Sequence, residues 1–424
     1  MLTTSLLRSV LLLHAAAGLV FGADDLPLPD VLRKAEGGDS GAQLALAIRY
    51  RDGKGVARNP AEAMRWGHRA ADQGNADAMD FVGFMYFRGV GVRHDPDLAV
   101  GYFKAAAPKS AQGAWNLGQC YFAAQGVPQD VPKALELWEK AAAMGHGRAA
   151  SVAAMTYLSG EGVQPDPAKA RRLAERAAEL NDPSGRIVLG ELHFQSGETD
   201  KARDLWAAVA RLKPTRLTGN PEQPSDELAS QQAADLIRLI EIRRRKAEPG
   251  KFNIVPVPHI LQGWNNCGAT SCAMLARTQG KAVGGWDFKK LCPSPLGTGT
   301  DWGDLVDAAE KIGLDWKLRT FPPDDGGFGQ ATDFVRGEID AGRPVVIDFK
   351  YIGPQYPNGE AGHTLLIAGY MTDGDLWILC NPAIPSPGLQ IMSAADLKHY
   401  WRSDHYGRSS NGVLSRPAIA ISTQ

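Results

Sequence analysis

Residues 259–276 read HILQGWNNCGATSCAMLA, and they place Cys267 between a polar loop and an apolar segment of helical length. The N–H groups at the start of a helix, together with the positive end of the helix dipole, stabilise a thiolate. Because the thiolate is the nucleophilic form of cysteine, this position suits an enzyme that transfers acyl groups. The stretch therefore predicts a nucleophile at the first turn of a helix.

Two later segments supply the partners that a cysteine nucleophile needs. His363 begins one apolar run of strand length, and Asn381 follows the next one. We expect His363 to accept the thiol proton and to return it to the leaving amine. Asn381 is expected to hold the imidazole in the right tautomer, because adjacent antiparallel strands bring the two residues together. The amide of Gln262 and the backbone N–H of Cys267 are the expected oxyanion donors.

Each of these assignments has an alternative. Cys267 is otherwise a buried structural thiol, and Asn381 is otherwise a turn residue before a proline. His259 competes as the base, although it precedes the loop and lacks a strand scaffold. The asparagines at 265–266 compete with the glutamine as oxyanion donors.

The region from residue 251 onward mixes helical segments with apolar runs bounded by Gly, Asn and Asp. Such runs are typical of strands, and helices that come before strands along a chain indicate an α+β domain. We expect the Cys267 helix to lie against an antiparallel sheet. The expected helices are 267–279, 301–312, 333–341 and a short one from 393, and the expected strands are 254–257, 344–349, 364–370 and 376–380.

A repeat of 35 or 36 residues dominates the region from 42 to 213. Each unit reads as a helix, a Gly-x-Gly-Val turn and a second helix, and a shortened fifth unit resembles an end cap. Neighbouring units bury the face that one unit cannot bury alone, so the pattern predicts an all-α solenoid. Four columns keep one register: Tyr50, Tyr86, Tyr121, Tyr157; Val56, Val92, Val127, Val163; Ala63, Ala99, Ala134, Ala170; and the Ala-Ala pairs that begin at Ala70, Ala106, Ala141 and Ala177.

The repeats resemble Sel-one-like repeats, which are relatives of tetratricopeptide repeats. This resemblance implies a scaffold that binds a protein partner; the alternative is a spacing arm without a ligand. The third unit carries the pattern most fully, in Leu117-Gly118, Tyr121, Gly126-Val127, Asp130, Lys133-Ala134, Trp138, Lys140-Ala141-Ala142 and Gly145.

Residues 252–401 resemble papain-like cysteine peptidases, most closely the bacteriocin-leader, or family thirty-nine, type. The resemblance implies a Cys/His/Asp-or-Asn triad with a Gln oxyanion donor. It departs at Asn381, where this branch more often has Asp and papain itself has Asn. Bacteriocin-leader peptidases normally precede membrane transporter domains, and we expect none in this chain. Removal of a leader from an exported peptide is therefore not carried over from the resemblance. The matching residues are Gln262, Asn265, Cys267-Gly268, Ser271, Met274, Gly362-His363, Gly369-Tyr370 and Asn381-Pro382.

Length and composition frame these assignments. The chain has 424 residues, a formal net charge of −1 and a pI near 6.8, so a multidomain protein is expected and nucleic acid is not an expected partner. Residues 1–22 have the basic start, apolar core and small residues of a signal peptide. We therefore expect a secreted or periplasmic protein that is not stably inserted in a membrane.

The expected organisation is a signal peptide at 1–22, a solenoid at 23–213, a linker and connecting helix at 214–250 and a papain-like domain at 251–424. The five cysteines leave at least one unpaired, and whether Cys272 pairs with Cys292 stays open. No cofactor or metal site is expected. The leading hypothesis is an exported cysteine peptidase acting on a peptide or protein. The alternatives are a catalytically silent domain in an interaction scaffold and an acyltransferase that forms a thioester.

Overall fold

In a computed structural model, the chain divides into two compact units, Met1–Leu117 and Gly118–Gln424. The expected signal segment and Gln262 lie outside the described residues. None of the described helices is both long and apolar enough to cross a bilayer. The structure describes residues 27–212, 226–244, 252–255, 257, 259–260, 267–293, 302–322, 324–351, 361–371, 375–381, 389–401 and 416–421.

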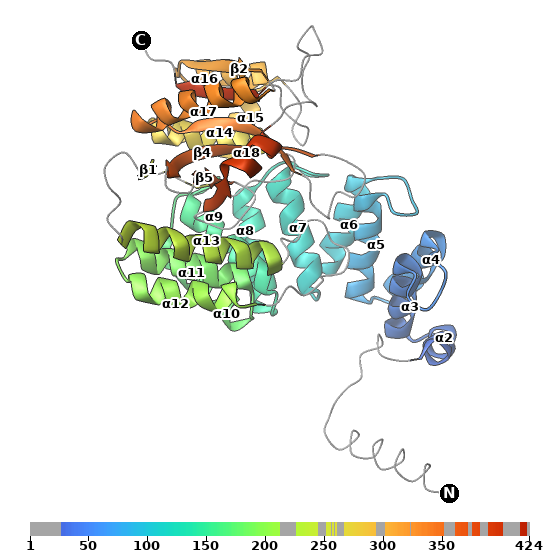
Figure 1. Cartoon of the computed structure of the whole chain (residues 1–424). Helices are drawn as coiled ribbons and strands as arrows, with labels where there is room; N and C mark the ends of the chain where they lie inside the picture. Colours follow the sequence, from blue (N-terminus) through green and yellow to red (C-terminus); the bar gives the residue numbers. More distant parts are fainter. Residues whose placement is uncertain are drawn as a thin grey trace, which may run out of the picture. The chain divides into compact units, whose positions relative to one another are not determined.

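The first unit is made of paired helices, as the repeat predicts (Figure 1). Side-chain oxygens of Asp39, Asn59, Asn75 and Asp95 accept from backbone N–H groups of the first turns and so begin four of these helices. Gly91 has φ +74°, and a Cβ there would lie 2.5 Å from Pro60, so the Gly-x-Gly turn requires glycine. The helices are α2 (Leu28–Glu36), α3 (Ser40–Asp52), α4 (Pro60–Asp72), α5 (Ala76–Arg88) and α6 (Pro96–Ala106), with α7 (Ala111–Ala123) beginning in this unit.

A buried carboxyl group links two successive repeats of the first unit. Asp80 on α5 is 8% exposed, and Asn116 Nδ2 on α7 donates to its Oδ1 at 2.7 Å. Burial raises the pKa of Asp80 to about 7, although the Asn116 hydrogen bond acts in the opposite direction. The folded state therefore binds a proton at Asp80 more tightly than the unfolded chain does.

Replacing this carboxyl by an amide is expected to stabilise the protein only where Asp80 is ionised. The wild type should lose stability as the pH rises from 3.8 to about 7. Asp80→Asn should therefore be more stable at pH 8, by about 2–4 kcal/mol, with the difference vanishing near pH 3.5. Urea unfolding of the full chain at both pH values measures this. Asp97→Asn, at an exposed position, controls for loss of one negative charge, and a pH-independent difference for Asp80→Asn would contradict the argument.

The second unit begins with further repeats and the connecting helix. The shortened fifth unit is present as α11 and α12, and α13 packs its apolar face against them. This cluster contains Ile187, Ala202, Trp206, Val209, Ala229, Ala233, Leu236 and Ile240. The helices are α8 (Val131–Ala143), α9 (Gly147–Ser159), α10 (Pro167–Glu179), α11 (Pro183–Gln195), α12 (Thr199–Ala210) and α13 (Asp226–Arg244).

A seven-stranded antiparallel sheet follows, in the order β2-β7-β3-β4-β5-β6, with β1 paired to β4. The chain is thus a helical repeat solenoid followed by an α+β domain. The strands are β1 (Phe252–Ile254), β2 (Trp316–Phe321), β3 (Val345–Tyr351), β4 (Ala361–Met371), β5 (Leu376–Cys380), β6 (Leu389–Ser393) and β7 (Arg416–Ile421). The helices are α14 (Cys267–Thr278), α15 (Gly285–Leu291), α16 (Trp302–Lys311), α17 (Asp325–Asp340) and α18 (Ala394–Tyr400).

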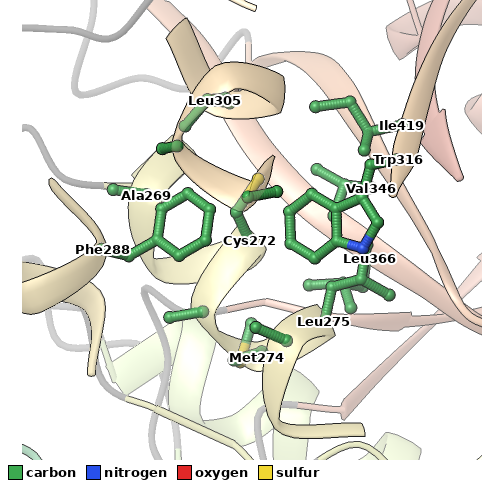
Figure 2. Close-up of a cluster of buried hydrophobic side chains, with 14 of the residues drawn as sticks. Ala269, Cys272, Met274, Leu275, Phe288, Leu305, Trp316, Val346, Leu366 and Ile419 are labelled. Carbon is green, nitrogen blue, oxygen red and sulfur yellow. The ribbon is translucent and has the colours of Figure 1, made fainter. Parts of the chain in front are cut away.

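Helices cover both faces of this sheet. Alternate residues of β3 and β4, such as Val346 and Leu366, pack against α14 and α16, and Figure 2 shows Cys272 among them. The residues between them, such as Val345 and Leu365, pack against α17 and α18. The predicted position of the Cys267 helix against an antiparallel sheet agrees with this arrangement.

The predicted elements were wrong in several places, since α15, β2, β6 and β7 were not expected and α17 begins earlier than predicted. Helix α17 starts eight residues before the expected 333, because Asp324 accepts from Gly327 N and begins the helix among glycines that are typical of loops. Strand β2 lies between α16 and α17, so the expected order of helices followed by strands fails there. Its exposed, mostly polar sequence, WKLRTF, gives little strand signal.

A buried glutamate joins the repeats to the α+β domain within the second unit. Glu161, in the turn after α9, accepts from the N–H groups of Gly285 and Trp286 at 3.1 and 3.2 Å. Arg277 on α14 donates to the Ser159 carbonyl at 2.6 Å. Burial raises the Glu161 pKa, while the Trp286 N–H and the Arg277 charge lower it. The start of α15 is therefore held by a carboxylate from the repeats.

The contact between Glu161 and the start of α15, here called the Glu161 joint, can be tested at Gly284. A Cβ added there would lie 2.5 Å from Glu161 Oε2. That oxygen cannot move without breaking a buried hydrogen bond, so we expect Gly284→Ala to destabilise the chain by about 1–3 kcal/mol. The matched control is Gly337→Ala on α17, where a Cβ meets nothing within 4 Å. The control should gain about 0.5–1 kcal/mol from helix propensity. Thermal unfolding distinguishes them, and equal effects of the two variants would refute the joint.

Candidate active site

The nucleophile candidate lies where the sequence predicted, at the start of a helix packed on the sheet. Cys267 is the first residue of α14 and is half-buried, whereas residues 268–276 are buried. Ser271 Oγ, one turn later, donates to the Thr364 carbonyl at 2.8 Å. A Cβ on Gly268 would lie 3.7 Å from Thr364 Oγ1. The first turn of α14 therefore rests on β4 at Thr364.

Through this contact, the backbones of two predicted site residues, Cys267 and His363, come near each other in space. His363 directly precedes Thr364, just as Cys267 directly precedes Gly268. In the β3–β4 ladder the Cα partner of His363 is Phe349. The His363 side chain lies outside the described part of the chain. The backbone of His363 is described, and it lies one residue before Thr364, which contacts α14.

Asn381 follows β5 and is 8% exposed. The β4–β5 ladder pairs Leu366 with Cys380, so Asn381 continues toward the His363 end of β4 and away from the turn between the strands. Its Nδ2 donates to Gln390 Oε1 on β6 at 3.0 Å. The side-chain amide is therefore fixed from the β6 side.

His259 holds the main chain of the same residue. It is buried, and its Nε2 donates to the Asn381 carbonyl at 3.0 Å. Burial lowers the His259 pKa to about 4, so the ring is neutral at pH 7 and serves as a hydrogen-bond donor. This contact gives His259 a structural role and makes it a poor competing base. The sequence offered no signal for it, because the acceptor is a carbonyl 122 residues away.

Lys289 on α15 carries a buried amine that interacts electrostatically with the candidate nucleophile. Its side chain is buried at 1% exposure. Burial lowers the Lys289 pKa, and the nearby groups Cys292, Asp304 and Cys267 act in the opposite direction. A cation so placed stabilises a thiolate at Cys267. Sequence reasoning assigned nothing to this lysine, because a lysine on a short helix is ordinarily exposed.

The remaining cysteines differ sharply from Cys267. Cys120, Cys272, Cys292 and Cys380 are buried, and none of the five cysteines forms a disulfide, so Cys272 and Cys292 are separate thiols. Burial raises the pKa of Cys292 to about 11 and that of Cys380 to about 12, and it raises the pKa of Cys272 well above its ordinary value. Cys272, Cys292 and Cys380 are therefore protonated at pH 7, and all four buried thiols pack as apolar groups.

Comparison with known families supports this architecture. Residues 40–75, 76–107, 111–146 and 148–182 match the Sel1 repeat, and residues 254–408 match the Peptidase_C39 like family. The chain thus carries four Sel1 repeats followed by a domain of the Peptidase_C39-like family. Among curated proteins, none matches the chain significantly.

Several solved structures are similar to the chain. A Sel1 repeat protein from Oxalobacter formigenes is 24% identical, with a TM-score of 0.40, over 47% of this chain and 76% of its own. A protective antigen with an SLR fold, present in uropathogenic Escherichia coli, is 19% identical, with a TM-score of 0.42, over 74% of this chain and 60% of its own.

The contrast among the thiols predicts selective alkylation. Iodoacetamide at pH 7 should modify Cys267 in the native protein, while the four buried cysteines should react only after denaturation, because alkylation requires an accessible thiolate. Peptide mapping by mass spectrometry measures each site. Cys292→Ser, at a buried position, should leave the modification of Cys267 unchanged. Equal modification of several cysteines in the folded protein would show that the burial argument fails.

Proposed function

We propose that this chain is an exported cysteine peptidase that hydrolyses an amide bond of a peptide or protein through Cys267, His363 and Asn381. The observation that carries the proposal is the hydrogen bond from Ser271 to Thr364, which brings the first turn of α14 to the residue after His363. The Peptidase_C39-like domain supports a cysteine peptidase fold. Sel1 repeats support an interaction with a protein.

In the proposed reaction, His363 takes the proton of the Cys267 thiol and the sulfur attacks the carbonyl carbon of the substrate. The C–S bond forms as the carbonyl becomes an oxyanion, which the Cys267 N–H and the Gln262 amide stabilise. Collapse breaks the C–N bond, and the imidazolium protonates the leaving amine. Water, deprotonated by His363, then attacks the thioester, and the thiol regains its proton as the carboxylic acid product leaves.

Two neighbouring groups support this chemistry. The Asn381 amide donates its N–H to Gln390, and its Oδ1 is the atom required to accept from the imidazole and fix the tautomer. The buried Lys289 ammonium favours the thiolate electrostatically. A helix start and a nearby cation both favour a thiolate, in keeping with an active-site cysteine.

The repeats and the N-terminal segment complete the proposal. The solenoid, residues 40–182 in the matched repeats, binds a protein that is either the substrate or a factor that presents it. The segment 1–22 acts as a signal peptide and directs the chain to the periplasm or the exterior. Cys267→Ala protein retains the repeats and the fold, so it suits capture of this partner.

The proposal is tested with a peptidyl acyloxymethyl ketone, an electrophile that resembles an acyl donor and reacts with activated thiols. Wild-type protein should be labelled at Cys267, and Cys267→Ala should not be labelled. His363→Ala should react about 10²–10⁴ times more slowly, because the general base is lost. Cys120→Ala, which alters a buried thiol of the repeats, should be labelled like the wild type.

Circular dichroism shows whether each variant is folded. If folded wild-type protein reacts no faster than glutathione, the domain is a silent part of an interaction scaffold and the peptidase proposal is wrong. If a supplied amine appears in the product in place of water, the same thioester chemistry belongs to an acyltransferase, and hydrolysis is wrong.

A further inference from the structure

Strand β6 is held on both sides, by the sheet and by the connecting helix. It pairs with β5, with Leu379 opposite Gln390 and Ile378 opposite Ile391. Asp235 Oδ2 on α13 accepts from the Ile391 N–H at 3.0 Å. Leu389 contacts both the core beneath α14 and the core between α13 and the end of the repeats. The position of β6 therefore depends on α13 as well as on β5.

Gln390 lies on β6, and its side chain contacts Asn381 of the candidate triad. Its Oε1 accepts from Asn381 Nδ2 at 3.0 Å. A carboxamide has a donor end and an acceptor end, so a bond to one end decides where the other end points. His259 holds only the main-chain carbonyl of Asn381 and leaves the amide plane undetermined. The bond to Gln390 therefore favours the orientation in which Oδ1, and not Nδ2, of Asn381 serves other partners.

We propose that Gln390 is a positioning residue of the active site, and that the connecting helix α13 holds it in place through Asp235. This inference rests on the proposed function, because it assigns Asn381 the task of orienting His363. With Nδ2 committed to Gln390, Asn381 presents Oδ1 to an imidazole N–H. Rotation of the Asn381 amide alone would set its Oδ1 against Gln390 Oε1, and two acceptors repel each other.

The anchor on α13 is well built for this task. Asp235 is 5% exposed, and Gln231 Nε2 donates to its Oδ1 at 3.1 Å while Oδ2 receives the Ile391 N–H. Burial raises the Asp235 pKa to about 6, and the Ile391 and Gln231 hydrogen bonds oppose that change. At pH 7 the group is mostly a carboxylate, the form that accepts both bonds.

The test is the pH dependence of Cys267 alkylation by iodoacetamide in the full chain, followed at that site by mass spectrometry. A thiolate paired with imidazolium reacts with a midpoint well below the free-thiol value of about 8.5. Gln390→Met removes the acceptor at similar size, so the midpoint should rise by about one unit. At a pH below both midpoints the rate should fall about tenfold. Gln390→Glu keeps an acceptor oxygen, so its midpoint should lie closer to the wild-type value than that of Gln390→Met.

The anchor is tested in the same way with a matched pair. Asp235→Asn keeps an oxygen that can accept from Ile391 and should retain the wild-type midpoint, whereas Asp235→Leu removes it and should shift the midpoint in the direction of Gln390→Met. All variants are compared at a temperature where circular dichroism shows them folded, since a purely structural role lowers the melting temperature without moving the midpoint.

The outcomes separate this inference from the proposed function. A wild-type midpoint near 8.5 means that no thiolate–imidazolium pair exists, and both proposals fail. A low wild-type midpoint that Gln390→Met leaves unchanged keeps the peptidase proposal and overturns the role of Gln390. A shift with Gln390→Met but none with Asp235→Leu overturns the role of α13 alone.

Discussion

The hydrogen bond from Ser271 to the Thr364 carbonyl is the constraint on which the candidate site depends. Both residues are buried, and a hydrogen bond between buried groups contributes about 1 kcal/mol to stability. Beside it, a Cβ on Gly268 would lie 3.7 Å from Thr364 Oγ1, so the helix and the strand are also in contact there. Together they set where the first turn of α14 meets β4, and the chemistry of Cys267 follows from that meeting.

Within the second unit, the α+β domain is tied to the preceding helices at two places. Glu161 comes from a turn of the solenoid and binds the start of α15, which lies next to α14. Connecting helix α13 reaches β6 through Asp235. The repeats of the second unit therefore contact α15, beside the Cys267 helix, and α13 contacts β6, beside Asn381.

Much of this was predictable from sequence because the signals are local. A period of 35 or 36 residues gives the solenoid, and apolar runs give β4 and β5. The position of Cys267 needs only a loop and a helix start. Contacts between distant residues were not predictable: His259, Gln390 and Lys289 look ordinary in sequence, and their roles come from partners that only the folded chain supplies. Helix α17 was misplaced because its capping aspartate outweighs three glycines.

The Glu161 joint bears on how such a chain is inherited. A sheet domain shuffled by recombination onto another scaffold would leave the amides of Gly285, Trp286 and Ile391 without the carboxylates that receive them. Its new neighbour would have to supply acidic side chains at the same places, or water would have to enter. The smallest piece that evolution can transplant intact is therefore larger than the piece that a family boundary at residue 254 outlines.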